Sequence, residues 1–192
     1  MSVSLRHTLL RWQVKVLLVL NRRDDALQRI ETVLAASPTD VYALSTRAHL
    51  LATLGRKDEA LKDLQALVRL HPDQAAHWFN LGFLSEELGQ LPAAEDAFRR
   101  ATELDPKLDR GWYGLALALI RQRKFDEAVV ALRKNTELQP MSPYGWYQLA
   151  RVHVDRQEPE EAAKIIRHLR GFEPKVAAQL VRETGLGEQA QA

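Results

Sequence analysis

The chain of 192 residues contains no cysteine, and this absence excludes several classes of protein at once. Disulfide-stabilised folds, thiol nucleophiles and thiolate metal sites all require that residue. A chain without cysteine suits a reducing compartment, and we expect a cytoplasmic protein, but many exported proteins lack cysteine as well. Cysteine usage therefore leaves the compartment open.

The chain also has little net charge. It carries 27 basic and 25 acidic residues, a formal charge of +2, and its pI is about 9.0. The two signs are interspersed along the sequence. Because nucleic-acid-binding proteins concentrate Lys and Arg on one face, we predict no nucleic-acid partner.

Long hydrophobic runs are missing too. The most apolar stretch, Leu9 to Leu20, is interrupted by Arg11, Gln13 and Lys15. A spanning helix needs about 20 apolar residues, and a signal peptide needs a longer unbroken core than Val16–Leu20. We predict no membrane span and no cleaved signal, and we expect this stretch to form the first helix.

Motifs that carry chemistry are absent. The sequence has no phosphate-binding glycine loop, dinucleotide fingerprint, metalloprotease motif or nucleophile elbow. The six histidines are scattered, and none pairs with another at i, i+4. Glu86 and Glu87 are neighbours in sequence, so on a helix they point in different directions. We predict that the chain is not an enzyme and uses no cofactor or metal.

One stretch, residues 78–106, carries the pattern that organises the chain. Its first half places four residues along one helix face, at i, i+3, i+4 and i+7: Trp78, Leu81, Gly82 and Ser85. Its second half does the same with Ala94, Phe98 and Ala101. Gly89 separates the halves, and Pro106 ends the second because proline cannot continue a helix. The stretch predicts a pair of helices.

The pattern recurs in both directions at a spacing of about 34 residues. The copies that follow it contain Trp112, Leu115, Ala116, Ala128, Leu132 and Pro140, and then Trp146, Leu149, Ala150, Ala162, Ile166 and Pro174. The copies that precede it contain Leu44, Ala48, Leu51, Ala60, Leu64 and Pro72, and Leu10, Val14, Leu17, Ala26, Ile30 and Pro38. The sequence is therefore a tandem array.

This pattern of tryptophan, leucine, small residue, aromatic and proline resembles the tetratricopeptide repeat (TPR) family. The resemblance covers five units, 7–40, 41–74, 75–108, 109–142 and 143–176. It implies an all-α, right-handed α-solenoid of antiparallel helix pairs. We expect a single domain over 1–184, with a C-terminal capping helix at about 175–184 and a disordered tail at 185–192.

In proteins that resemble this one, the first helix of each pair lines a concave groove that binds a peptide or protein segment. Carried over position by position, the groove residues we select are Tyr42, His49, Phe79, Asn80, Phe83, Arg110, Tyr113, Leu117, Arg121, Tyr144, Tyr147, Gln148 and Arg151. Tyrosine and arginine are frequent interface anchors. We therefore expect a partner segment with apolar anchors and acidic groups, although an aromatic at the position of Phe79, Tyr113 and Tyr147 is also ordinary in this family.

Some family members hold a partner's terminal carboxylate with a set of Lys, Asn and Arg side chains on three successive units. Of that set only Asn80 and Arg110 are present here in the right places. The sequence therefore argues against such a clamp. It does not separate an adaptor from a recognition subunit of some other enzyme.

The first unit suggests an alternative function. Its first helix, expected from about His7 to Leu20 after a frayed lead-in at 1–6, is apolar on more than one side. A terminal unit should have a polar outer face. Either the lead-in folds back over this helix or the helix contacts another molecule, and residues 7–20 are our candidate for a homodimer contact in a self-associating assembly or tether protein.

Two polar residues stand where the family usually carries apolar ones. For Arg47 we expect the aliphatic stem to pack while the guanidinium reaches water, the alternative being an ion pair or a ligand contact. Asn135 either loosens the packing of its helix or is satisfied by a backbone carbonyl. Both positions show whether polar side chains at packing positions of the array find hydrogen-bond partners.

Overall fold

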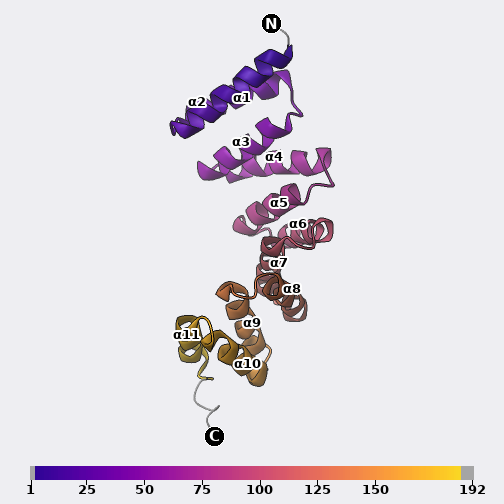
Figure 1. Ribbon diagram of the computed structural model, residues 1–192. Helices are drawn as coiled ribbons and strands as arrows, with labels where there is room; N and C mark the ends of the chain where they lie inside the picture. Colours follow the sequence, from indigo (N-terminus) through magenta and orange to yellow (C-terminus); the bar gives the residue numbers. More distant parts are fainter. Residues whose placement is uncertain (1–2, 187–192) are drawn as a thin grey trace. The chain divides into compact units, whose positions relative to one another are not determined.

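The computed structural model describes residues 3–186 of the chain, and the side chains from Thr8 onward. Within that range the chain forms helices and no strand (Figure 1). The helices are α1 Val3–Val19, α2 Arg23–Ala36, α3 Val41–Thr53, α4 Lys57–Leu70, α5 Ala75–Glu87, α6 Leu91–Leu104, α7 Asp109–Arg121, α8 Phe125–Leu138, α9 Pro143–Asp155, α10 Pro159–Arg170 and α11 Pro174–Thr184. The expected all-α fold is confirmed.

The expectation for the start of the first helix was wrong. The helix α1 begins at Val3, so residues 3–6 extend it rather than fray or fold back. Those residues contain neither proline nor glycine, and each residue added to an existing helix gains a backbone hydrogen bond. Residues 1–2 and most of the predicted tail, 187–192, lie outside the described part of the chain.

The helices form two compact units. The N-terminal unit ends at Leu88 and contains α1–α5, whereas the C-terminal unit begins at Gly89 and contains α6–α11. Within each unit, consecutive helices pack on one another, as α3 does on α4 and α7 on α8.

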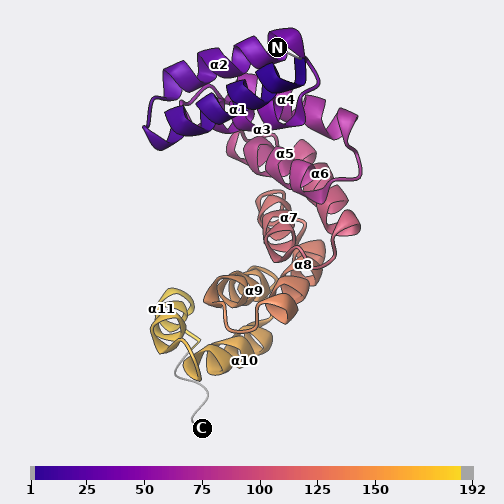
Figure 2. The same cartoon turned by 45° about the horizontal axis from the view of Figure 1, so that its top comes forward.

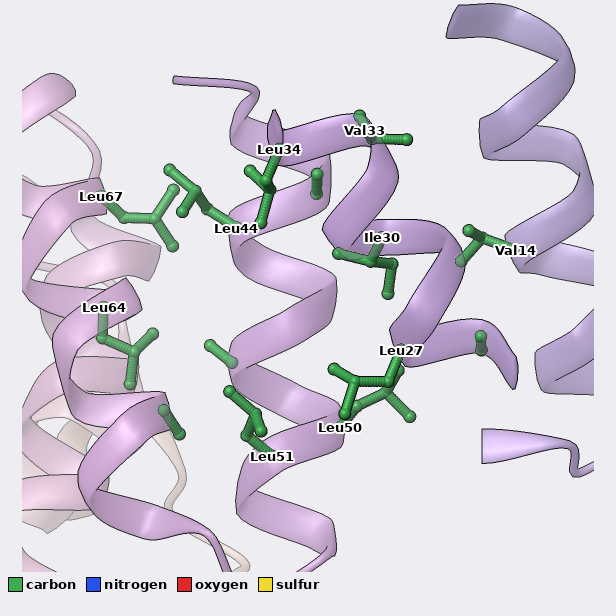
Figure 3. Packing of buried hydrophobic residues seen from close by; sticks show 14 of the residues in the cluster. Val14, Leu27, Ile30, Val33, Leu34, Leu44, Leu50, Leu51, Leu64 and Leu67 are labelled. Carbon is green, nitrogen blue, oxygen red and sulfur yellow. The ribbon is translucent and has the colours of Figure 1, made fainter. Parts of the chain in front are cut away.

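The core of the N-terminal unit is a ribbon of aliphatic side chains (Figure 3). Val14 from α1, Ile30 from α2, Leu44 from α3 and Leu67 from α4 are all buried. They recur at helical spacing, so each helix presents one apolar stripe to its neighbours. Burying each such side chain contributes about 1.5–3 kcal/mol, and this burial holds the short helices together.

In the C-terminal unit, the core depends on one close approach. A Cβ on Gly114 would lie 2.6 Å from the ring of Phe98, which is fully buried. Glycine at this position therefore lets the Phe98 ring of α6 pack directly on the backbone of α7. Leu119, Leu132 and Ile166 continue the core through α7, α8 and α10.

Each tryptophan of the repeat pattern makes the same hydrogen bond. The indole N–H groups of Trp78, Trp112 and Trp146 donate to the carbonyl oxygens of Pro72, Pro106 and Pro140, at 2.9, 3.0 and 2.9 Å. Each proline lies two residues after the end of one helix, and the tryptophan on the next helix binds the carbonyl of that proline in the connection. The two residues of the pattern therefore work together.

The turns inside the pairs also repeat. Asn21, Gly55, Gly89, Arg123 and Gln157 all have positive φ, between 55° and 79°. At the other connections, the side chain of Asp40 caps α3 by accepting the backbone N–H of Ala43, and Gly185 ends α11 in the left-handed region.

Arg47 is half-buried and forms an ion pair, one of the two roles considered for it. Its guanidinium donates to both carboxylate oxygens of Asp63 on α4, at 2.8 and 2.6 Å, and Asp63 is buried. The alternative of an ion pair is correct, because a buried carboxylate on the facing helix needs a paired donor. Asn135 is satisfied as one of its alternatives predicted, by donating to the carbonyl of Asp109 at 2.9 Å.

Candidate functional site

The first candidate site is a hollow in the N-terminal unit, between α3 and α5, with α4 beneath it. Its volume is about 160 Å³. It is lined by Ser45, Ala48, His49, Ala52, Leu64, Asn80, Phe83, Leu84 and Glu87. Three of the groove residues selected from the sequence, His49, Asn80 and Phe83, meet here. The hollow is well below the roughly 300–1,000 Å³ of small-molecule sites, and its size suits one side chain of a larger partner.

The floor and the rim of this hollow differ in chemistry. Ala48, Leu64 and Leu84 form an apolar floor and are buried. The ring of Phe83 stands at the rim and is 52% exposed. Asn80 adds an amide that both donates and accepts hydrogen bonds, and Glu87 is 3.4 Å from Lys57. The arrangement can bury an apolar side chain while hydrogen-bonding its backbone.

The second candidate site lies in the C-terminal unit, where α7 and α9 begin and α8 ends. This hollow of about 540 Å³ is lined by Asp109, Arg110, Tyr113, Asn135, Gln139, Ser142 and Tyr144. It brings together Arg110, Tyr113 and Tyr144 from the selected set. Tyr144 is 70% exposed. A guanidinium and two phenol rings around one hollow can hold an acidic group beside an apolar one.

Gly145 packs against Asn135, which lines this second hollow. A Cβ at Gly145 would lie 2.2 Å from Oδ1 of Asn135, whose amide nitrogen already bonds to the carbonyl of Asp109. The asparagine on α8 and the glycine on α9 therefore fit each other.

Of two other selected residues on α9, Tyr147 contacts α11 and Arg151 lies beside Tyr147. The hydroxyl of Tyr147 donates to Oε2 of Glu183 at 2.7 Å, and Gln179 donates to Oε1 of the same carboxylate at 2.8 Å. Hydrogen bonds from Gln179 and then Tyr147 lower the pKa of Glu183. The bond to Glu183 raises the pKa of Tyr147, and burial adds to the shift.

The remaining selected residues do not line either hollow. The guanidinium of Arg11 and the ammonium of Lys15 lie over the ring of Tyr42, 5.5 and 5.9 Å from its centre. The others are placed on α5, α7 and α9: Phe79, Leu117, Arg121 and Gln148. Their predicted role in binding therefore stays a prediction.

Sequence reasoning missed part of both hollows. Ala48 and Leu64 were assigned to the repeat pattern and Leu84 to no role, yet all three form the floor of the first hollow. Gln139 and Ser142, in the connection before α9, line the second. No periodicity identifies connection residues as lining, but the small side chains Ser45, Ala48 and Ala52 on one face of α3 are a signal for a depression.

A separate surface surrounds α1. Trp12 is 62% exposed, Val19 86% and Leu20 61%. A hollow of about 280 Å³ lies between α1 and α2 beside Trp12. In the part of the chain that the structure describes, Oε1 of Gln13 is buried without a hydrogen-bond partner. An apolar surface beside an unsatisfied acceptor is unusual for a solvent-facing helix.

The part of the chain that the structure describes shows neither a metal site nor a membrane-spanning helix. No group of His, Asp or Glu side chains there could hold a metal ion. None of the helices is both long enough and apolar enough to cross a membrane.

Several solved structures share this fold. The crystal structure of MamA protein aligns with a TM-score of 0.80 and 21% identity, covering 97% of both chains. MamA 41-end from Desulfovibrio magneticus RS-1 aligns with a TM-score of 0.80 and 19% identity, covering 88% of this chain and 96% of that one. YrrB, described as a TPR protein with an unusual peptide-binding site, aligns with a TM-score of 0.78 and 18% identity, covering 88% of each chain. At these identities the likeness shows the fold.

A search of curated protein sequences finds no significant match. The sequence model of the tetratricopeptide repeat family, in contrast, matches residues 13–61, 45–109 and 113–173. With the repeating helix pairs and the recurrent tryptophan-to-proline bond, these matches establish that the chain belongs to the tetratricopeptide repeat family.

Proposed function

We propose that this chain is a non-catalytic protein-interaction scaffold that binds segments of a partner protein through its hollows. The observation that carries this proposal is the hollow between α3 and α5. It combines an apolar floor, an exposed aromatic ring and an amide at Asn80 on a rigid helical frame. Peptide-binding sites use this combination, because the pocket takes the side chain while polar groups bind the backbone.

The hollow of the C-terminal unit supports the expectation that the partner carries acidic groups. Arg110 can pair with a carboxylate, and Tyr113 and Tyr144 offer rings for an apolar anchor. A flexible segment loses conformational entropy when it binds, so we expect micromolar affinity, about −8 kcal/mol.

Affinity capture from the native organism's lysate tests this proposal. We expect the double variant Arg110→Ala with Tyr113→Ala to lose the main partner, because it removes the cation and one of the two phenol rings from the second hollow. Circular dichroism should show unchanged helicity, since neither side chain is buried.

A matched control comes from α8. Val130→Ala with Lys134→Ala also removes one apolar and one cationic side chain, both exposed and neither lining a hollow. This control should capture the partner as the unmodified chain does. Equal capture by all three proteins would reject binding of the main partner at the second hollow.

The surface around α1 favours a second candidate function, self-association in an assembly or tether. Exposed Trp12, Val19 and Leu20 would be buried in a contact between copies. The contact would then use the face that the repeat array leaves uncovered.

Sedimentation velocity over a range of concentrations tests this candidate. Self-association predicts a dimer that Trp12→Arg dissociates, whereas Val130→Arg, on an exposed residue of α8, leaves it intact. A monomer at every concentration would exclude the second candidate and leave the first untouched.

A further inference from the structure

The C-terminal helix α11 packs against both α10 and α9 (Figure 2). Its buried residues, Ala177 and Leu180, close the core at the end of the C-terminal unit. The connection from α10 to α11 spans residues 171–173, whereas the connections that precede α3, α5, α7 and α9 each have one residue more. The helix α11 is therefore not simply one more repeat helix in register.

Beyond this core contact, α11 bonds to Tyr147, a residue selected for binding, and Arg151, a second selected residue, lies beside Tyr147. Glu183 accepts the hydroxyl of Tyr147, and Nη1 of Arg151 lies 3.5 Å from the same hydroxyl. The Arg151 guanidinium also lies 5.8 Å from the centre of the Tyr147 ring. In this structure the Tyr147 hydroxyl is therefore already hydrogen-bonded to a carboxylate carried on a helix.

The position of Glu183 is unfavourable for α11 itself. It lies in the last turn of the helix, which ends at Thr184, and negative charge there opposes the helix dipole. The bond to Tyr147 offsets this cost. The contact with α9 is therefore more specific than capping requires, because Ala177 and Leu180 already supply the apolar cover.

We propose that α11 is an internal occupant of the α9 surface, and that the partner segment for this surface is an acidic helix whose carboxylate replaces Glu183 on Tyr147. The inference rests on the proposed function and names the partner chemistry for this part of the C-terminal unit. Bound and free states then differ by an exchange of one carboxylate-bearing helix for another.

Hydrogen exchange tests whether Glu183 holds α11 in place. If the contact with Tyr147 matters, Glu183→Ala accelerates exchange of the α11 amides several-fold, although alanine and the lost charge favour the isolated helix. The neighbouring exposed residue supplies the control, and Arg182→Ala should leave exchange within about twofold of the unmodified chain. Slower or unchanged exchange in Glu183→Ala would overturn the proposal.

A titration tests the exchange of helices. The probe is a synthetic peptide of residues 173–186, followed by the NMR signals of labelled tyrosine and arginine. A tethered helix has a millimolar effective concentration, so the unmodified chain should bind the peptide weakly. We expect Glu183→Ala to bind it about fivefold more tightly with shifts at Tyr147 and Arg151, and the same peptide with Gln at position 183 to bind less well.

Tyr147→Phe combined with Glu183→Ala should abolish the preference between the two peptides, because the hydroxyl that distinguishes them is gone. Equal binding, or no binding, by the unmodified chain, Arg182→Ala and Glu183→Ala would contradict the proposal. If the peptide titration fails but the Arg110→Ala, Tyr113→Ala variant still loses the partner, the proposed function stands. Arg110 and Tyr113 line the second hollow and not the surface around Tyr147.

Discussion

Single residues show where this array departs from a regular repeat and how each departure is accommodated. Gln157 occupies the turn position at which Gly55 and Gly89 stand in other repeats, and its φ is 62°. A residue with a Cβ is strained in this region, whereas glycine is not. The turn between α9 and α10 therefore carries a small local cost.

We predict that Gln157→Gly stabilises the chain by about 0.5–1 kcal/mol, after allowance for the greater freedom of glycine in the unfolded state. Urea unfolding followed by circular dichroism measures it. Glu160→Gly, in the first turn of α10 with ordinary helical geometry, should destabilise instead. A loss of stability in Gln157→Gly would show that the turn is not strained.

Asn135 and Gly145 should be energetically coupled. Gly145→Ala places a Cβ against Oδ1 of Asn135, so we predict a loss of about 1–3 kcal/mol. Asn135→Ala loses the bond to Asp109, a cost of about 1 kcal/mol. Because alanine at 135 removes the obstacle, the double variant should be no less stable than Gly145→Ala alone. Additive losses in this double-mutant cycle would refute the coupling.

At the scale of elements, one buried carboxylate joins α6 to the turn after α7. Glu95 accepts hydrogen bonds from Lys124 at 2.7 Å, Gln122 at 2.8 Å and Arg99 at 2.9 Å. Burial alone would raise the pKa of Glu95. The hydrogen bonds outweigh burial, and the net direction is below the ordinary value of 4.5.

This shift predicts how stability depends on pH. Because the folded-state pKa of Glu95 is lower than the unfolded one, its contribution is complete above about 4.5 and is lost as the pH falls through the folded-state pKa. Glu95→Gln should therefore lower stability at neutral pH and flatten its decline toward acid. Unfolding between pH 7 and pH 3 measures this, and Glu137→Gln, on the exposed face of α8, should keep the original slope.

The elements themselves could be predicted from sequence, because helical periodicity and the proline stops fix them. The helices α3, α5, α7 and α9 begin at the residues where the spacing starts each unit. The start of α1 could not be predicted from the sequence, since no helix-stopping residue precedes it. The bonding partners of Arg47 and Glu95 also could not be predicted. These partners lie on neighbouring helices or turns, and the bonds depend on rotamers that spacing does not determine.

At the scale of the whole molecule, the repeat pattern predicts the frame better than the site. The aromatic positions on α5 and α7 were known, but the hollows depend on small residues such as Ala48 and on connection residues such as Ser142. The contact between Tyr147 and Glu183 could not be anticipated, because α11 leaves the repeat spacing. Of the residues that line each hollow, selection by family position identified at most half.

The central claim is that a partner segment binds in the hollow between α3 and α5. Isothermal titration of the captured partner into Phe83→Ala tests it most directly, with Val130→Ala as the matched loss of an exposed apolar side chain. The account predicts that Phe83→Ala weakens binding by about tenfold or more, as truncation of an aromatic anchor does, and that Val130→Ala leaves it unchanged. Equal affinity in the two variants would contradict it.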